Sequence, residues 1–154
     1  MQKLRLENGM LARALHQQLH SRLLGFCKEY SPELPGEPII QSWLQRLYDG
    51  DGNLHILVTL DDNLNIIGHA VIDVQEVYGS KVVWCHQAQG DKGAQSTLDE
   101  GVEYVDKLVN IVGAYCSIFI TSKHIKALEK KYNYKPARSI MVKYAHDVPM
   151  DNSE

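Results

Sequence analysis

The sequence predicts an α/β protein in which helices pack on one central mixed β-sheet. Residues 54–86 contain three runs with strand-like apolar patterning, and the short turns between them are typical of an antiparallel meander. Residues 95–112 place apolar side chains along one helical stripe, which needs another element to cover it. The apolar run at 115–121 then returns the chain to the sheet. An antiparallel meander followed by a helical crossover gives a sheet of mixed direction.

Length and composition indicate an ordinary globular protein. The 154 residues suit one domain, which we expect to span residues 1–146 before a polar tail at 147–154. The net charge of −3 and the pI near 6.1 argue against a general nucleic-acid-binding protein. We see no apolar run of the roughly 20 residues that a membrane span needs, and the first residues lack the apolar core of a signal peptide. We therefore expect a protein of the cytoplasm.

The first third of the chain predicts one strand and two helices. Lys3–Glu7 has the pattern of a short strand, and leucines at helical spacing predict an amphipathic helix over residues 10–29. Three prolines and a glycine in residues 31–38 predict a loop. A second helix is expected over 38–48, with Pro38 at its first position.

The middle of the chain predicts the meander itself. Apolar residues alternate or cluster over residues 54–60, 66–77 and 81–86, and each run reads as a strand. Asp61-Asp-Asn63 and Tyr78-Gly-Ser80 supply the turns between them.

The last third predicts two further helices and two further strands. The helix over 95–112 has a capping-box pattern near its start and Gly113 as a C′ residue. A strand over 115–121, a helix over 122–132 and a last strand over 139–144 complete the order β-α-α-β-β-β-α-β-α-β.

The segment Gln87–Ala94 is the main candidate binding site. It lies between an apolar strand and a capped helix, and it contains Gly90 and Gly93. A glycine-bearing turn at a helix start leaves backbone N–H groups free and adds partial positive charge, which suits a phosphate. The alternative is a solvated connection with no ligand.

Titratable residues near strand ends are candidates for acid–base chemistry. His86 ends the third strand of the meander, where it can act as a general base or serve as an ordinary strand histidine. Asp73 and Glu76 lie toward the end of the preceding strand, where they can orient an amine or simply face solvent.

No metal site is expected. His16 and His20 lie four residues apart on a predicted helix, and His55 and His69 lie on adjacent predicted strands, but neither pair has an evident third ligand. The three cysteines are widely spaced, and two of them lie in apolar strand patterns, as buried thiols do in a reducing compartment.

The element order and two segments resemble the GCN5-related N-acetyltransferase (GNAT) superfamily over nearly the whole chain. The family's Gln/Arg-x-x-Gly-x-Gly/Ala signature is similar to Gln87-Ala-Gln-Gly90-Asp-Lys92. Its Asn-x-x-Ala-x-x-x-Tyr-x-x-x-Gly-Phe region is similar to the segment Ser122–Tyr134.

The resemblance implies an enzyme that moves an acetyl group from acetyl-coenzyme A to a primary amine, without a metal. The implied catalytic residues are His86, Tyr132 and Glu76. The residues implied to bind coenzyme A are Cys85, Gln87, Gly90, Asp91, Lys92, Gly93, Ala94 and Ser122.

The segment departs from the family pattern at several positions. Lys92 replaces the expected glycine or alanine, and Glu129 aligns with the tyrosine that protonates the departing thiolate in the family. Tyr132 follows three residues later as a substitute. These departures favour an alternative, in which the chain is a catalytically inactive GNAT-fold protein that binds protein partners or forms part of a larger, bacteriophage-encoded assembly such as a virion.

Overall fold

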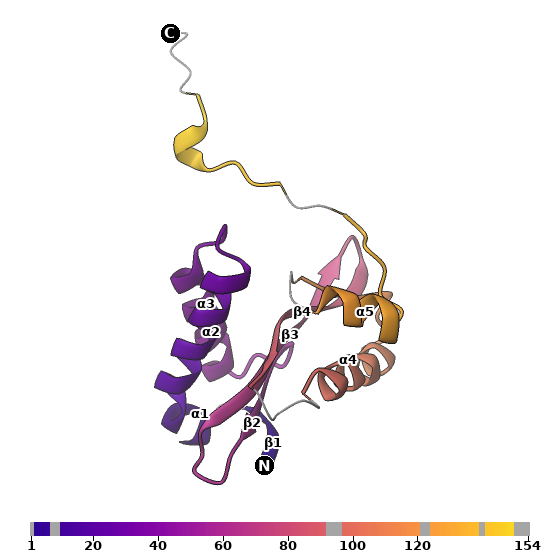
Figure 1. The fold of residues 1–154 in the computed structure, drawn as a ribbon. Helices are drawn as coiled ribbons and strands as arrows, with labels where there is room; N and C mark the ends of the chain where they lie inside the picture. Colours follow the sequence, from indigo (N-terminus) through magenta and orange to yellow (C-terminus); the bar gives the residue numbers. More distant parts are fainter. Residues whose placement is uncertain (1, 7–9, 92–96, 121–123, 139–140, 150–154) are drawn as a thin grey trace. The chain divides into compact units, whose positions relative to one another are not determined.

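The computed structural model describes residues 2–6, 10–91, 97–120, 124–138 and 141–149. The chain divides into two compact units, Met1–His124 and Ile125–Glu154. The first unit contains the sheet and most of the helices (Figure 1). The single domain expected over residues 1–146 stays a prediction. Within the described residues, we find no helix with the length and apolar character needed to cross a membrane.

One five-stranded mixed sheet forms the centre of the first unit, as predicted. In spatial order its strands are β1 (Gln2–Leu6), β2 (Leu54–Leu60), β3 (Ile66–Val77), β4 (Ser80–Gly90) and β5 (Cys116–Phe119). The pairs from β1 to β4 are antiparallel, whereas β4 and β5 run parallel. A tight hairpin joins β3 to β4, and both of its turn residues have positive φ, 51° at Tyr78 and 80° at Gly79. Two positive φ values are the signature of a type I′ turn, whose twist matches the strands.

Helices cover both faces of this sheet (Figure 1). On one face, α1 (Met10–Ala14), α2 (His16–Tyr30) and α3 (Gly36–Tyr48) pack on β1–β3 through a cluster of buried aliphatic residues. On the other face, α4 (Thr97–Val112) packs on β3–β5 through Val105 and Leu108. Each fully buried aliphatic side chain stabilises the fold by about 1.5–3 kcal/mol. Gly113 has φ +67°, which confirms it as the left-handed residue that ends α4.

Two predicted boundaries at the N-terminal helices are wrong. The helix predicted over residues 10–29 is interrupted at Leu15, whose φ of −93° and ψ of 2° lie outside the helical region. Helix α3 begins at Gly36, so Pro38 is its third residue rather than its first. Pro38 still lies in the first turn, where a missing N–H costs no intrahelical hydrogen bond.

The predicted loop after residue 86 is also partly wrong, because β4 continues to Gly90. β3 is 12 residues long and supplies partners for this extension, with Gly68 opposite Gly90 and His69 opposite Gln89. Strand pairing therefore takes up the first half of the segment that was predicted as a glycine-bearing loop.

The second unit is described by itself. It contains α5 (Ile125–Lys131), which lies inside the helix predicted over 122–132, and a short 3₁₀ helix over Ala145–Asp147. The prediction of a last strand over 139–144 is wrong for residues 141–144, because a strand needs a paired neighbour and none of the described strands pairs with them. Residues 139–140 lie outside the described part of the chain.

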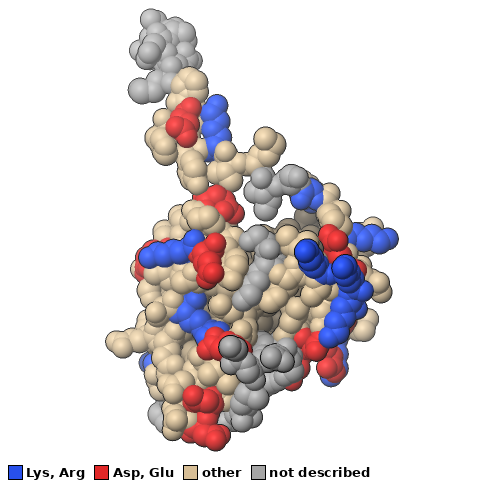
Figure 2. All heavy atoms as spheres, in the orientation of Figure 1, with Lys and Arg blue, Asp and Glu red and all other residues tan. Residues whose placement is uncertain are grey.

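Charged side chains of both signs are interspersed on the face drawn in Figure 2. This mixture accords with the small net charge of −3.

Candidate functional site

The most distinctive backbone feature of the first unit is the separation of two neighbouring strands. The parallel pairing of β4 and β5 ends at Cys85 and Phe119, and one more backbone bond follows, 3.0 Å from the Ile120 nitrogen to the Cys85 oxygen. Beyond Cys85, β4 pairs with β3 alone up to Gly90. One edge of β4 is thus left without a strand partner among the described strands. Such an edge can pair with the amide groups of an extended ligand.

His86 lies at the point of separation, in a β-bulge. Val71 pairs with Gln87 and Ile72 pairs with Cys85, so His86 is the extra residue on β4. A bulge redirects a side chain that regular pleating would place elsewhere. The imidazole lies near two indole rings, with centroid distances of 5.4 Å to Trp43 and 6.4 Å to Trp84. Its side chain is 21% exposed, so part of the ring reaches solvent.

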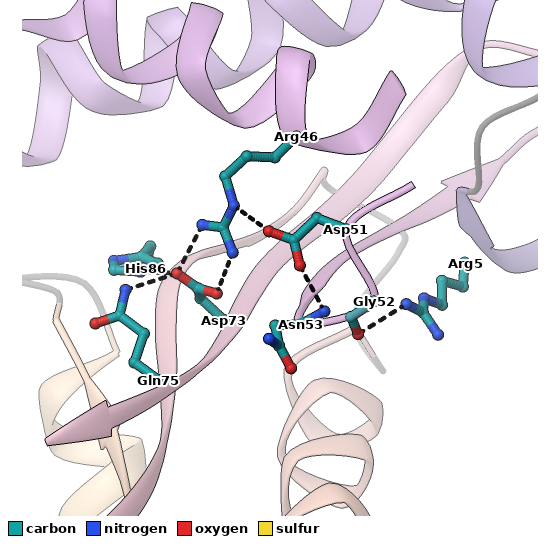
Figure 3. A network of polar contacts seen from close by, with 8 residues as sticks. All are labelled: Arg5, Arg46, Asp51, Gly52, Asn53, Asp73, Gln75 and His86. Atoms are coloured by element: carbon teal, nitrogen blue, oxygen red, sulfur yellow. Dashed lines mark hydrogen bonds and ion pairs between the residues drawn. The ribbon is translucent and has the colours of Figure 1, made fainter. Parts of the chain in front are cut away.

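A buried carboxylate lies beside His86 (Figure 3). The Asp73 side chain is 1% exposed, and its Oδ2 atom is 3.9 Å from His86 Nε2. Arg46 donates two hydrogen bonds to Asp73, of 2.9 Å to Oδ2 and 2.8 Å to Oδ1. Gln75 Nε2 donates a third, of 2.7 Å, to Oδ2. These donors hold the carboxylate in one orientation.

The electrostatics keep Asp73 ionised. Burial acts to raise the pKa of this carboxyl group, but the nearby imidazole of His86 and the hydrogen bonds from Arg46 and Gln75 lower it below its ordinary range. Arg46 also binds Asp51, with 2.7 Å between Nε and Oδ2. One cation and two carboxylates therefore give this group a net charge of −1 while His86 is neutral. A proton on His86 would bring the sum to zero.

The arginine also connects this group to the turn before β2. Asp51 Oδ1 accepts a hydrogen bond of 2.9 Å from the Asn53 nitrogen. The neighbouring Gly52 oxygen accepts one of 3.4 Å from Arg5 Nη2 (Figure 3). Helix α3, this turn and β3 are held together around Arg46.

A second polar network lies beyond the bulge, toward the end of β4. Arg22 of α2 donates from Nε to His69 Nδ1 at 2.7 Å, and the other ring nitrogen, Nε2, is 2.9 Å from Gln87 Oε1. Gln87 Nε2 donates to the Leu23 oxygen at 3.1 Å. Because Arg22 can only donate, His69 Nδ1 is an acceptor and Nε2 carries the proton. The network anchors α2 to the last residues of β4.

The structure brings only some of the predicted catalytic residues together. His86 lies beside Asp73 rather than Glu76, which is exposed near the hairpin and pairs in register with Lys81. Glu76 is three residues from Asp73, so strand alternation places the two side chains on opposite faces. Tyr132 belongs to the second unit, where the Lys131 ammonium lies 5.4 Å from its ring centroid. Its role as an acid stays a prediction.

The residues predicted to bind coenzyme A are placed as follows. Cys85 is buried at the last β4–β5 pair, and burial raises the pKa of its thiol to about 12. Gly90 pairs with Gly68. The Asp91 nitrogen donates to the Ile67 oxygen at 2.8 Å. Its carboxylate accepts from Arg22 at 2.8 Å. Gln87 uses its side chain in the network above. Four further predicted residues lie outside the described part of the chain: Lys92, Gly93, Ala94 and Ser122.

Sequence reasoning did not identify Arg22 and Arg46 as site residues, and it did not single out Asp73 as the partner of His86. Asp73 carried a signal, since an acidic residue interrupts the otherwise apolar run Ala70–Val74. Arg22 and Arg46 lie on amphipathic helices, where an arginine usually faces solvent, and nothing in their spacing names a partner. Among the described residues, no group of three or more His, Cys, Asp or Glu side chains is placed to hold a metal ion.

Comparison with known proteins identifies the fold. No protein-family model and no curated protein sequence matches the chain. Solved structures match the chain. One is a predicted acetyltransferase with acetyl-CoA from Clostridium acetobutylicum, with a TM-score of 0.68 at 12% identity over 96% of this chain and 99% of that one.

Two further matches are also acetyltransferases. Glucosamine-6-phosphate N-acetyltransferase from Arabidopsis thaliana has a TM-score of 0.66 at 13% identity, over 94% of this chain and 99% of that one. An aminoglycoside acetyltransferase from an uncultured soil metagenomic sample has a TM-score of 0.58 at 20% identity, over 93% of each chain. Likeness at these identities is a likeness of fold, and the chain has the fold of the GNAT superfamily.

Proposed function

We propose that the protein transfers an acetyl group from acetyl-coenzyme A to a primary amine. The observation that carries this proposal is the bulged His86, which lies beside a buried carboxylate at the point where β4 leaves β5. A general base needs an accessible ring nitrogen and a fixed orientation. The His86 side chain is 21% exposed, and its imidazole lies near the rings of Trp43 and Trp84 and beside the Asp73 carboxylate.

The open edge of β4 suits the amide groups of a pantetheine arm. His124 Nε2 lies 3.1 Å from the Ala88 oxygen, so this backbone acceptor of the edge contacts a group outside the sheet, whose place an N–H donor of a ligand would take. A pantetheine amide is a donor of the same kind. Residues from His86 to Gly90 would hold the arm, and the residues Lys92, Gly93 and Ala94 would hold the phosphates. When bound, acetyl-coenzyme A supplies the thioester carbonyl with which the amine forms a C–N bond as the C–S bond breaks.

The chain's own contribution is positioning and proton transfer. His86 takes the proton that the amine loses, and its partly exposed ring passes that proton to water. Tyr132 would return a proton to the departing thiolate, because a phenol stays protonated at neutral pH. Glu129, at the position of the family's tyrosine, is normally ionised at neutral pH and repels a thiolate.

A second candidate function is a non-catalytic GNAT-fold protein that binds other proteins. The contacts of Asp91 favour it, because its amide binds Ile67 and its carboxylate binds Arg22. Neither group is then free for a phosphate, and a carboxylate beside a polyanion is repulsive.

Two measurements on the intact protein separate these functions. Calorimetric titration with acetyl-coenzyme A reports binding, and release of free thiol with a panel of primary amines reports transfer. If the protein is an acetyltransferase, we expect binding of acetyl-coenzyme A together with amine-dependent release of thiol. Binding without release, or no binding, contradicts the proposal and favours the non-catalytic protein. Thiol release without amine serves as the control for simple hydrolysis.

A further inference from the structure

We infer that Asp73, held by Arg46, is the positioning residue that keeps the proton of neutral His86 on Nε2 and leaves Nδ1 as the base. The inference rests on the proposed function and names the atom that accepts the amine proton. It rests on three features of the structure. Arg46 fixes the buried Asp73 carboxylate, His86 Nε2 faces that carboxylate, and Nδ1 is the ring nitrogen on the other side of the imidazole.

The carboxylate is fixed and can only accept. Asp73 is 1% exposed and receives both Arg46 guanidinium nitrogens at 2.8 and 2.9 Å. A bidentate arginine restricts the carboxylate to one plane. An ionised carboxylate has no proton to donate.

The imidazole is oriented by its neighbours. Nε2 faces Asp73 Oδ2 at 3.9 Å, an ion-pair separation that exceeds a hydrogen bond, as catalytic contacts often do before a substrate binds. A lone pair on Nε2 would face a negative oxygen, whereas an N–H there is attracted to it. The ring of Trp84 stacks on the imidazole at an interplanar angle of 6°, and Trp43 covers it at 37°. These two rings limit rotation of the imidazole.

The consequence is a single neutral tautomer. With the proton on Nε2, the lone pair of the neutral ring is on Nδ1. When the amine attacks, the proton leaves its nitrogen for Nδ1, and the resulting imidazolium is stabilised by Asp73. The group around Arg46 then has no net charge.

The test removes the carboxylate without leaving an unpaired arginine. Replacing Asp73 alone leaves Arg46 partly unpaired, so the variant to use is the double substitution Arg46→Met with Asp73→Leu. Replacing a buried ion pair by apolar residues of similar size is often neutral for stability. The matched control is Glu103→Leu with Lys107→Met, because this pair is an exposed ion pair of 3.1 Å on α4.

Nitrogen-15 NMR of the His86 ring, at a pH where the ring is neutral, measures the tautomer independently of activity. We expect only the Nε2–H form in the wild-type protein and in the control, and a mixture in the Arg46→Met/Asp73→Leu variant. In the transfer assay we expect kcat to fall about 10-fold or more in that variant, as part of what a base supplies, with KM for acetyl-coenzyme A unchanged.

The outcomes are distinguishable. An Nδ1–H form in the wild-type protein, or the same mixture in wild type and variant, overturns the inference. A single Nε2–H form in a protein that releases no thiol with any amine overturns the proposed function and the base role of Nδ1, while the positioning by Asp73 stands.

Discussion

His69 and His86 lie on adjacent strands, His86 in the bulge and His69 in the paired region beyond it, and their surroundings differ sharply. His69 is 1% exposed, and both of its ring nitrogens have short contacts, of 2.7 Å to Arg22 and 2.9 Å to Gln87. His86 is 21% exposed and has one ring nitrogen facing a carboxylate at 3.9 Å. The first histidine has both nitrogens engaged within the protein. The second histidine is oriented by Asp73 through Nε2, and its Nδ1 can still accept a proton from an external group. The comparison shows that unused hydrogen-bonding capacity, together with partial exposure, distinguishes the candidate base from the structural histidine.

The largest expected effect is on catalysis at His86. His86→Gln should lower the rate of acetyl transfer about 10²- to 10⁴-fold, the range that a general base supplies. The free energy of unfolding should change by less than about 1 kcal/mol, as is usual away from a fully buried network. Thiol release and urea denaturation measure the two quantities. His146→Gln, at a side chain that is 79% exposed, is the control and should change neither. An active His86→Gln enzyme would remove the base from the proposed mechanism.

The next effect is on stability at His69. His69→Leu should lower the free energy of unfolding by about 1–3 kcal/mol, because it leaves the side-chain oxygen Oε1 of Gln87 and the Nε–H group of Arg22 without their His69 partners. Urea denaturation measures the change. His20→Leu is the control, since His20 is 30% exposed and its contact with Glu37 is a surface ion pair, worth at most about 1 kcal/mol. Equal losses in the two variants would mean that the His69 network does not anchor α2.

The smallest effect concerns pH and a third histidine, which is both buried and hydrogen-bonded. His55 is 6% exposed, and its Nδ1 lies 2.6 Å from the Tyr104 hydroxyl. Burial, and then the charge of Arg5, lowers the pKa of His55 below its ordinary value. The unfolded chain therefore binds the proton first, and the stability from neutral His55 is lost as pH falls below about 6.5.

We expect the free energy of unfolding to decrease from pH 7 to pH 5, with a contribution from His55 of no more than about 1.4 kcal/mol per pH unit, the limit for one proton. In His55→Gln this decrease should be shallower. Denaturation at several pH values, compared with the His146→Gln variant, measures the difference. Parallel pH profiles for wild type and His55→Gln would show that His55 does not titrate differently in the folded state.

Local patterns in the sequence determined most of the fold. Two strands, Leu54–Leu60 and Ile66–Val77, lie where apolar patterning and turn residues placed them. Helix α4 ends at the predicted Gly113. These features depend on neighbours within a few residues, and the side-chain period of 2 or 3.6 makes them readable from one chain. His86 was singled out because a histidine at a predicted strand end next to a glycine-bearing segment is a local pattern, and its role as a base stays a prediction.

Tertiary pairing decided the rest. The extension of β4 to Gly90 depends on the length of β3, and the bulge at His86 depends on the register between the two strands. The partnership of Asp73 with Arg46 joins residues that lie 27 positions apart. A charge on an amphipathic helix has many potential partners, and only the packing of α3 on the sheet selects one. The residue types that chemistry needs were visible in the sequence, whereas the contacts that orient them exist only in the folded chain.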